Sequence, residues 1–343
     1  MGRRRFIGTL ATVAAFFSVV NIALITCAWA QQPAKLPKVA ILSQRAPTAQ
    51  PCSANMQAST LPCFLEAMGE LGYVDGKTVS FEIRSAEEDY TRLPALAAEL
   101  VGLRPDVIYT AGAGAAAAAK ATTTIPIIVG PASEETLTRL AGILARPTGN
   151  VTGFTLVSVE QEIKLLQILK EVAPRTSRLA LVLNPDNPGY RNYPGTLTPT
   201  AAHLGVTLIK IEARNVSDLP QALAAIAASG ANAIYLFDDA VLAGSGLVRK
   251  QVGDWALKRR LPVVSPNARV ASDGGLLSFG TDLNTLNRRA AAYVDKVLKG
   301  AKPADLPVER PSKFNLSLNV RTAKVLGLTI PQSLLLRADE VIQ

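Results

Sequence analysis

The order of strands and helices in this sequence occurs twice, and that repetition constrains the fold more than any other feature. The segments "IPIIVGPA" (125–132) and "LPVVSPNA" (261–268) share one pattern: an apolar residue, a proline, a β-branched run and a turn of small residues. Around each of them, short β-branched runs alternate with Ala/Leu-rich stretches, which indicates alternating strands and helices. The strands are continuous apolar runs, as is typical of parallel sheets covered by helices on both faces. We therefore predict an α/β protein with two doubly wound parallel-sheet lobes.

The two halves match element by element. In the first half we predict strands at 38–43, 78–84, 106–110, 125–129 and 150–155, and helices at 62–72, 92–103, 114–121 and 134–145. In the second half we predict strands at 178–184, 206–212, 232–236, 261–265 and 274–280, helices ending at 205 and spanning 218–230, and a helix at 284–299 that returns to the first lobe.

Ligands of open parallel sheets bind outside the carboxyl ends of the strands, so two facing lobes surround one cleft with such ends. The candidate ligand-binding residues therefore lie at or just beyond the ends of predicted strands: Ser43, Gln44, Gly112, Ala113, Gly114, Ala115, Pro131, Ala132, Ser133, Asn184, Asp186, Asn187, Tyr190, Phe237, Asp238, Asn267, Phe279 and Gly280.

We assign these candidates three roles. Helix N-termini and backbone N–H groups near Gly114 and Ser133 are expected to hold a ligand carboxylate. Asp238 or Asn187 is expected to hold a polar or cationic group. Tyr190, Phe237 and Phe279 are expected to form an apolar wall.

Several of these motifs have structural alternatives. The "GAGAAA" segment (112–117) resembles a dinucleotide-binding fingerprint, but it follows the third strand of its lobe rather than the first. Its small residues also fit close helix packing or a close approach of a ligand to the backbone. Ser133 fits a helix N-cap, and the Asp238–Asp239 pair fits capping of a helix near Gly244 and Ser245. Turn chemistry alone explains "NPDNPGY" (184–190).

Catalytic and nucleic-acid functions find little support in the sequence. His203 is the single histidine, so a Ser-His-Asp or Cys-His arrangement has no centre near the strand ends. No zinc-protease motif, P-loop or C-x-x-C motif is present, and we predict no metal, no cofactor and no enzymatic activity. Lysines and arginines do not form a stripe with interleaved aromatics, so we predict no nucleic-acid partner.

Residues 1–30 are interpreted as a secretory signal peptide. Three arginines at 3–5 precede an apolar stretch from Phe6 to Ile25, and "AWA" fits a cleavage site after Ala30. The "RRRFI" segment resembles a twin-arginine signal. An uncleaved membrane anchor is the alternative. Export favours a disulfide between Cys52 and Cys63 over two free thiols, since they are the two cysteines of the mature chain.

A resemblance to a known family covers nearly the whole mature chain. It is carried by "RRRFIG", "ELGYVDGKTVSFEIRSAEEDYTRLPALAAELV" (70–101), "TTTIPIIV", "ARPTGNVTGFT" (145–155), "LVLNPDNP" and the C-terminal segment "LKGAKPADLPVERPSKFNLSLNVRTAKVLGLTIPQSLLLRADEVI". These segments resemble the extracytoplasmic substrate-binding proteins of ABC transporters, in the branch that takes up tryptophan and other aromatic amino acids.

The resemblance implies the type I periplasmic-binding-protein fold with a three-crossing hinge. The expected lobes are residues 31–153 plus 282–312 and residues 154–281 plus 313–343. It also implies a periplasmic receptor that closes on a small amphipathic amino acid or carboxylate and docks to an ABC permease, as a monomer or weak dimer. Two alternatives stay open: a ligand-sensing protein that docks to a membrane receptor, and a periplasmic enzyme that uses the cleft.

Overall fold

A first sheet of five parallel strands is built from the N-terminal repeat. The computed structural model of this protein describes residues 35–46, 52, 60–156, 159–187 and 193–343. The strand order is β2-β1-β3-β4-β5, and every pair in the sheet is parallel. The strands are β1 (Lys38–Ser43), β2 (Ser80–Ser85), β3 (Val107–Thr110), β4 (Ile127–Ala132) and β5 (Val151–Thr155).

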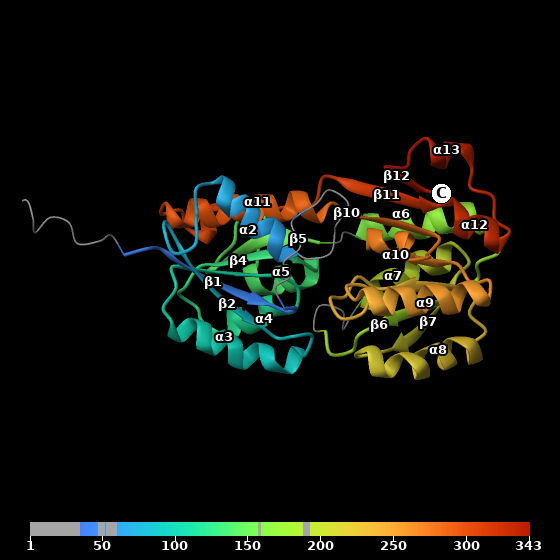
Figure 1. Ribbon diagram of the computed structural model, residues 1–343, viewed down its shortest axis with the longest axis horizontal. Coiled ribbons are helices and arrows are strands. Elements are labelled where there is room, and N and C mark those ends of the chain that lie inside the picture. The colour runs from blue at the N-terminus through green and yellow to red at the C-terminus, as the bar shows by residue number, and fades with distance from the viewer. Residues whose placement is uncertain (1–34, 47–51, 53–59, 157–158, 188–192) are drawn as a thin grey trace, which may run out of the picture. The chain divides into compact units, whose positions relative to one another are not determined.

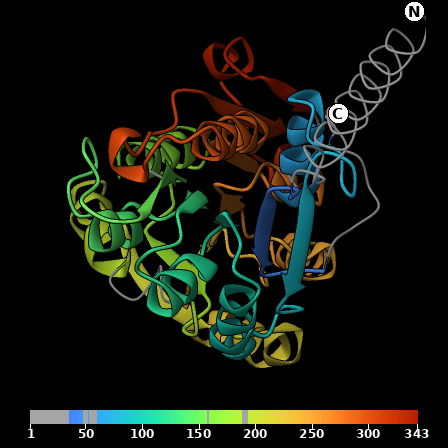
Figure 2. The ribbon, with the colours of Figure 1, turned by 90° about the vertical axis from the view of Figure 1, so that its left-hand side faces the viewer.

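Helices cover both faces of this sheet. One face carries α2 (Thr60–Glu70) and α11 (Leu283–Leu298), which pack on each other. The other carries the short η1 (Tyr90–Arg92), α3 (Leu93–Gly102), α4 (Gly114–Ala121) and α5 (Glu134–Ala141). Figure 2 shows the blue α2 and the orange α11 on one side of the sheet and the teal helices on the other. We call this part lobe 1.

A second sheet of seven strands is built from the C-terminal repeat, and we call the part around it lobe 2 (Figure 1). Its order is β12-β11-β10-β9-β8-β6-β7. The strands are β6 (Arg178–Leu183), β7 (Thr207–Glu212), β8 (Ala233–Leu236), β9 (Val263–Ser265), β10 (Leu277–Thr281), β11 (Phe314–Asn319) and β12 (Glu340–Ile342).

In this second sheet the five strands predicted from the sequence, β6 to β10, are all parallel, whereas β11, which was not among the predicted strands, is antiparallel to β10. The reason lies in the path of the chain. It leaves β10 at the carboxyl end of the strand, forms α11 in lobe 1, and then returns to lobe 2 from that same edge. A strand that enters the sheet at this edge has to run in the opposite direction.

The helices of lobe 2 also form two layers. One layer contains α6 (Val159–Val172), α7 (Tyr193–His203), α12 (Val320–Leu326) and α13 (Gln332–Leu335). The other contains η3 (Val216–Asp218), α8 (Leu219–Ala228), α9 (Gly246–Lys258) and α10 (Ala268–Ser272). No helix in the described parts of the chain combines the length and the apolar character needed to cross a bilayer.

Three chain crossings connect the lobes, and hydrogen bonds join them to one another. The first crossing follows β5, the second follows β10, and the third lies between η4 (Pro303–Asp305) and β11. Thr155 N–H donates to the Glu309 carbonyl over 2.9 Å, and Asp282 N–H donates to the Lys313 carbonyl over 3.1 Å. The Thr281 hydroxyl donates to the Leu156 carbonyl. These bonds hold the three segments together as one bridge.

The predicted fold class is confirmed: the structure is α/β, with two doubly wound lobes and three crossings. The helix predicted at 134–145 is shorter and ends at Ala141, because Gly142 takes a φ of +72° that terminates it. The predicted signal peptide, residues 1–30, lies outside the described residues.

Candidate ligand-binding cavity

A cavity of about 130 Å³ lies where the carboxyl ends of strands from both sheets meet. A water needs roughly 10–15 Å³ on this measure, so the space suits about ten waters or one small organic molecule. Its lining residues lie in or after the carboxyl-terminal halves of β1, β3, β4, β5, β6, β8 and β9, and at the starts of α2 and α11. The lining residues are Ile41, Leu42, Ser43, Gln44, Arg45, Leu61, Tyr109, Ala111, Gly112, Pro131, Leu156, Asn187, Asp238, Ala240, Gly244, Asn267 and Leu283.

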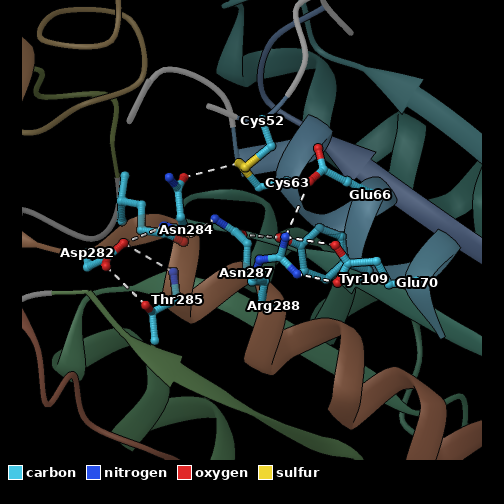
Figure 3. Close-up of a disulfide and its surroundings, with 11 residues drawn as sticks. Cys52, Cys63, Glu66, Glu70, Tyr109, Asp282, Asn284, Thr285, Asn287 and Arg288 are labelled. Atoms are coloured by element: carbon cyan, nitrogen blue, oxygen red, sulfur yellow. Dashed lines mark hydrogen bonds and ion pairs between the residues drawn. A yellow bond between two sulfur atoms is a disulfide. The ribbon is translucent and has the colours of Figure 1, made fainter. Parts of the chain in front are cut away.

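The lobe 1 wall of the cavity is mainly apolar and includes Tyr109, although Ser43, Gln44 and Arg45 also line it. The Tyr109 ring stacks on Phe64, with ring centroids 3.7 Å apart and planes 2° from parallel. Its hydroxyl donates to Asn287 Oδ1 over 2.8 Å, and Asn287 Nδ2 donates to the Leu283 carbonyl over 2.6 Å. Figure 3 shows this connection between β3 and α11. The ring is therefore held in one orientation, and its hydroxyl has an acceptor within lobe 1.

A disulfide lies beside this wall. Cys52 and Cys63 are bonded, with Cα atoms 4.7 Å apart, so the predicted disulfide is present. Cys63 belongs to the first turns of α2, close to the lining residue Leu61. Its sulfur also contacts Asn284 Oδ1 of α11 at 3.1 Å (Figure 3). The bond thus fixes the position of residue 52 next to the rim of the cavity.

The lobe 2 wall is polar. Asn267 Nδ2 donates to Asp238 Oδ1 over 2.8 Å, and both side chains line the cavity. Burial raises the pKa of the Asp238 carboxyl, while the Asn267 hydrogen bond and the charges of Arg249 and Arg269 oppose that rise. A carboxylate in a cavity of this size is suited to an ammonium group of a ligand.

The loop after β8 also reaches across to lobe 1. Asp239 is buried, and its Oδ2 accepts from the Tyr90 hydroxyl at 2.9 Å and from Asn187 Nδ2 at 2.6 Å. Val241, only 1% exposed, packs within the core of lobe 1. Arg45 of lobe 1 donates from Nη1 to the Gly244 carbonyl over 2.7 Å. We call residues 239–244 the docking loop; its contacts hold the lobes together, and its residues Ala240 and Gly244 also line the cavity.

Seven of the predicted ligand-binding residues line the cavity: Ser43, Gln44, Gly112, Pro131, Asn187, Asp238 and Asn267. Ten lie elsewhere: Ala113, Gly114, Ala115, Ala132, Ser133, Asn184, Asp186, Phe237, Phe279 and Gly280. Tyr190 lies outside the described residues.

The expected carboxylate sites near Gly114 and Ser133 are occupied by internal hydrogen bonds. The N–H groups of Gly112, Gly114 and Ala115 all donate to backbone carbonyls. Ser133 caps α5: its hydroxyl oxygen accepts from Thr136 N–H at 3.2 Å, which is the structural alternative for this residue. These groups therefore have no free donors of that kind to offer a ligand.

The small residues near the strand ends serve packing. A Cβ atom on Gly114 would lie 2.2 Å from Thr110 Oγ1, and one on Gly280 would lie 1.6 Å from the Pro266 carbonyl oxygen. Ala113, Ala115 and Ala132 are buried in the lobe 1 core. The two glycines thus permit close contacts within the protein, with Thr110 and Pro266.

The aromatic and polar residues that miss the cavity have other partners. Phe237 is fully buried in the lobe 2 core, and Phe279 stacks on Phe314. Asn184 donates from Nδ2 to the Arg214 carbonyl over 3.1 Å, and Asp186 forms a 3.6 Å ion pair with Arg214. The apolar wall expected from Phe237 and Phe279 is instead supplied by lobe 1.

Sequence reasoning missed Tyr109, Leu61 and Arg45. Tyr109 lies inside β3, whereas the predicted residues lie at or beyond the ends of strands. The signal that could have found it is period-2 alternation, because Tyr109 lies two positions before Ala111, the residue after the strand, which also lines the cavity. Leu61 and Arg45 belong to segments whose position depends on tertiary packing.

Comparison with known proteins identifies the family. A model described as "ABC transporter substrate binding protein" matches residues 49–342. The chain belongs to this family. Among curated proteins, the ABC substrate-binding protein described here is 23% identical over 267 residues to a tyrosine-binding protein of Clostridioides difficile, covering 77% of this chain and 75% of that protein.

Solved structures share its fold. A conserved domain protein from Vibrio cholerae is 28% identical, with a TM-score of 0.79, covering 90% of this chain and all of the other. The ABC domain of a Streptococcus protein in complex with L-Trp has the same TM-score of 0.79 and coverage at 22% identity. The substrate-binding protein therefore has the type I periplasmic-binding-protein fold.

Proposed function

We propose that this substrate-binding protein is an exported receptor that captures an aromatic amino acid for an ABC importer. The observation that carries the proposal is the division of the cavity between the lobes. Lobe 1 contributes the Tyr109 ring and aliphatic side chains, while lobe 2 contributes Asp238 and Asn267. A molecule with a flat apolar end and a charged polar end satisfies both walls.

Two similar proteins support this choice of ligand. The relative from Clostridioides difficile is a tyrosine-binding protein, and the Streptococcus structure contains L-Trp. The space of about 130 Å³ suits a molecule of that class.

Export and partners follow from the same proposal. The sequence of residues 1–30 supports secretion to the periplasm, with cleavage after Ala30 and an ABC permease as the membrane partner. We propose a monomer or weak dimer without nucleic acid or cofactor. A binding role rather than catalysis is supported by His203, which is exposed on α7 and does not line the cavity. Among the described residues, no three His, Cys, Asp or Glu side chains gather as a metal site.

The proposal is tested with residues 31–343, unfolded and refolded to remove any bound ligand. Calorimetric titration with L-tyrosine and L-tryptophan is expected to give saturable binding, and D-glucose and succinate none. At a hundredfold excess over Kd, binding stabilises the folded protein by about 2.7 kcal/mol, which raises its melting temperature. Absence of binding by both amino acids would overturn the proposed ligand class.

Variants of Tyr109 then test the wall. Tyr109→Phe keeps the ring and is expected to bind within about threefold of wild type, whereas Tyr109→Leu loses about tenfold or more. Tyr73→Leu is the matched control, because Tyr73 also donates its hydroxyl within lobe 1, to Asp295 at 3.0 Å, but lies outside the cavity. Equal affinity of Tyr109→Leu and wild type would remove Tyr109 from the site.

A further inference from the structure

The guanidinium of Arg269 has two buried donors without a partner. Arg269 lies in α10, two residues after Asn267; Asn267 lines the cavity, and Arg269 is not among the lining residues. Its Nε and Nη2 atoms are buried and make no hydrogen bond. These two nitrogens form one edge of the guanidinium, the fork that matches the two oxygens of a carboxylate. A buried donor without an acceptor is destabilising, so such an edge needs an explanation.

The neighbouring acids do not supply the missing acceptor. Asp273 Oδ2 accepts from Arg249 Nε at 2.6 Å, and Asp238 Oδ1 accepts from Asn267. The buried guanidinium of Arg249, in the same lobe, does have hydrogen-bond acceptors. Arg249 is 6% exposed, and its Nη1 also donates to the Ala243 carbonyl over 2.6 Å. Arg249 is near enough to lower the pKa of Arg269, yet Nε and Nη2 of Arg269 have no such acceptor.

Positively charged residues of both lobes, Arg249 and Arg45, lie near the Arg269 guanidinium. Burial, and then the charges of Arg249 and Arg45, lower the pKa of Arg269 to about 10, while the charges of Asp273 and Asp238 oppose that fall. Arg45 belongs to lobe 1 and lines the cavity, so contact between the lobes places two guanidinium groups near each other. Glu88 is already paired with Arg45 Nε, at 3.1 Å. An anion at this position would reduce the charge repulsion between Arg269 and Arg45, and it would accept hydrogen bonds from Nε and Nη2 of Arg269.

We propose that the Nε–Nη2 edge of Arg269, beside Arg45, receives the carboxylate of the ligand, while Asp238 receives its ammonium group. The inference rests on the proposed function for the amino-acid class and adds the recognition of both charges of a zwitterion. The carboxylate, by joining groups from both lobes, favours the state in which they are in contact.

The first test compares Arg269→Met with wild type in calorimetric titrations with L-tyrosine and L-tyrosinamide. Wild type is expected to bind the amide roughly 10- to 100-fold more weakly than the acid, and Arg269→Met to lose a similar factor for the acid and little for the amide. Arg259→Met is the matched control, since Arg259 lies over the Trp255 ring in the same lobe and away from the cavity. An unchanged preference for the acid in Arg269→Met would overturn the proposal.

A second test does not depend on amino-acid binding. Without ligand, sodium acetate is expected to raise the melting temperature of wild type more than sodium chloride at equal ionic strength, and Arg269→Met is expected to lose that difference. Equal acetate responses of the two proteins would overturn the anion site. A lost response together with no binding of tyrosine or tryptophan would retain the carboxylate site and reject the proposed amino acid.

Discussion

The two lobes repeat one succession of elements and yet differ in the chemistry that they present to the cavity. The carboxyl ends of β1 and β3 in lobe 1 contribute the apolar Ile41, Leu42 and Tyr109, with Ser43, Gln44 and Arg45 beyond them. The corresponding ends of β6, β8 and β9 in lobe 2 contribute Asn187, Asp238 and Asn267. The difference teaches that the repeated pattern fixes where a ligand lies, while the residues at a few strand ends decide which part of the ligand each lobe recognises.

The largest expected effect is on the polar wall of lobe 2. Asp238→Asn removes the carboxylate and is expected to weaken amino-acid binding by about 3 kcal/mol, because a buried ammonium would lose its charged partner. Asp186→Asn is the control, since Asp186 is exposed, pairs with Arg214 and does not line the cavity. Titration calorimetry measures both. If Asp238→Asn bound L-tyrosine as wild type does, the assignment of the head group to lobe 2 would be wrong.

The disulfide exists in lobe 1 only, and its removal tests that wall. Replacing Cys52 and Cys63 by serine opens a short loop and is expected to lower the free energy of unfolding by about 3 kcal/mol. Affinity is expected to fall as well, because Cys63 lies near Leu61 on α2. Urea denaturation and calorimetry measure the two effects. Unchanged stability of the double variant would contradict the expected role of the bond.

A smaller effect is expected from the docking loop, which joins the walls. Val241→Ala removes apolar volume that is buried in lobe 1 only while the lobes are in contact. We expect a loss of about 1–2 kcal/mol in ligand affinity, although Val241 does not line the cavity. Val325→Ala, at an exposed position, is the control. Small-angle X-ray scattering of the ligand-free variant is expected to report a larger radius of gyration than wild type; an identical radius and affinity would show that the loop does not favour closure.

The smallest effect concerns a buried acid in α6. Burial raises the pKa of Glu162 well above 4.5, and its Oε1 has no hydrogen-bond partner. The folded state therefore binds a proton that the unfolded state has released, so stability falls as pH rises from 4.5 towards the raised value. Glu162→Gln is expected to gain about 1 kcal/mol near neutral pH and to flatten this dependence. Melting temperatures between pH 4 and 8 measure it, with Glu171→Gln as the control; parallel curves for Glu162→Gln and wild type would reject the explanation.

Much of the fold could be predicted because apolar runs and Ala/Leu-rich stretches report local structure directly. The helix at 114–121 matches α4 in both ends. The direction of β11 could not be predicted, since it depends on the path of the chain through lobe 1. Position after a strand found Asp238 and Asn267, but the same rule also selected Phe237, whose side chain points into the core.

The sequence alone determined the two α/β lobes, the edge of the sheets where a ligand should lie, and the cysteine pair. These follow from periodicity, from the geometry of parallel sheets and from export chemistry, each of which acts over short stretches of chain. Only the tertiary structure decided that Tyr109 rather than Phe237 faces the cavity, that Val241 of one lobe packs in the core of the other, and that Arg269 has no acceptor. The reason is that these facts depend on contacts between residues far apart in the chain, where burial and competition for partners, rather than local propensity, set the position of each side chain.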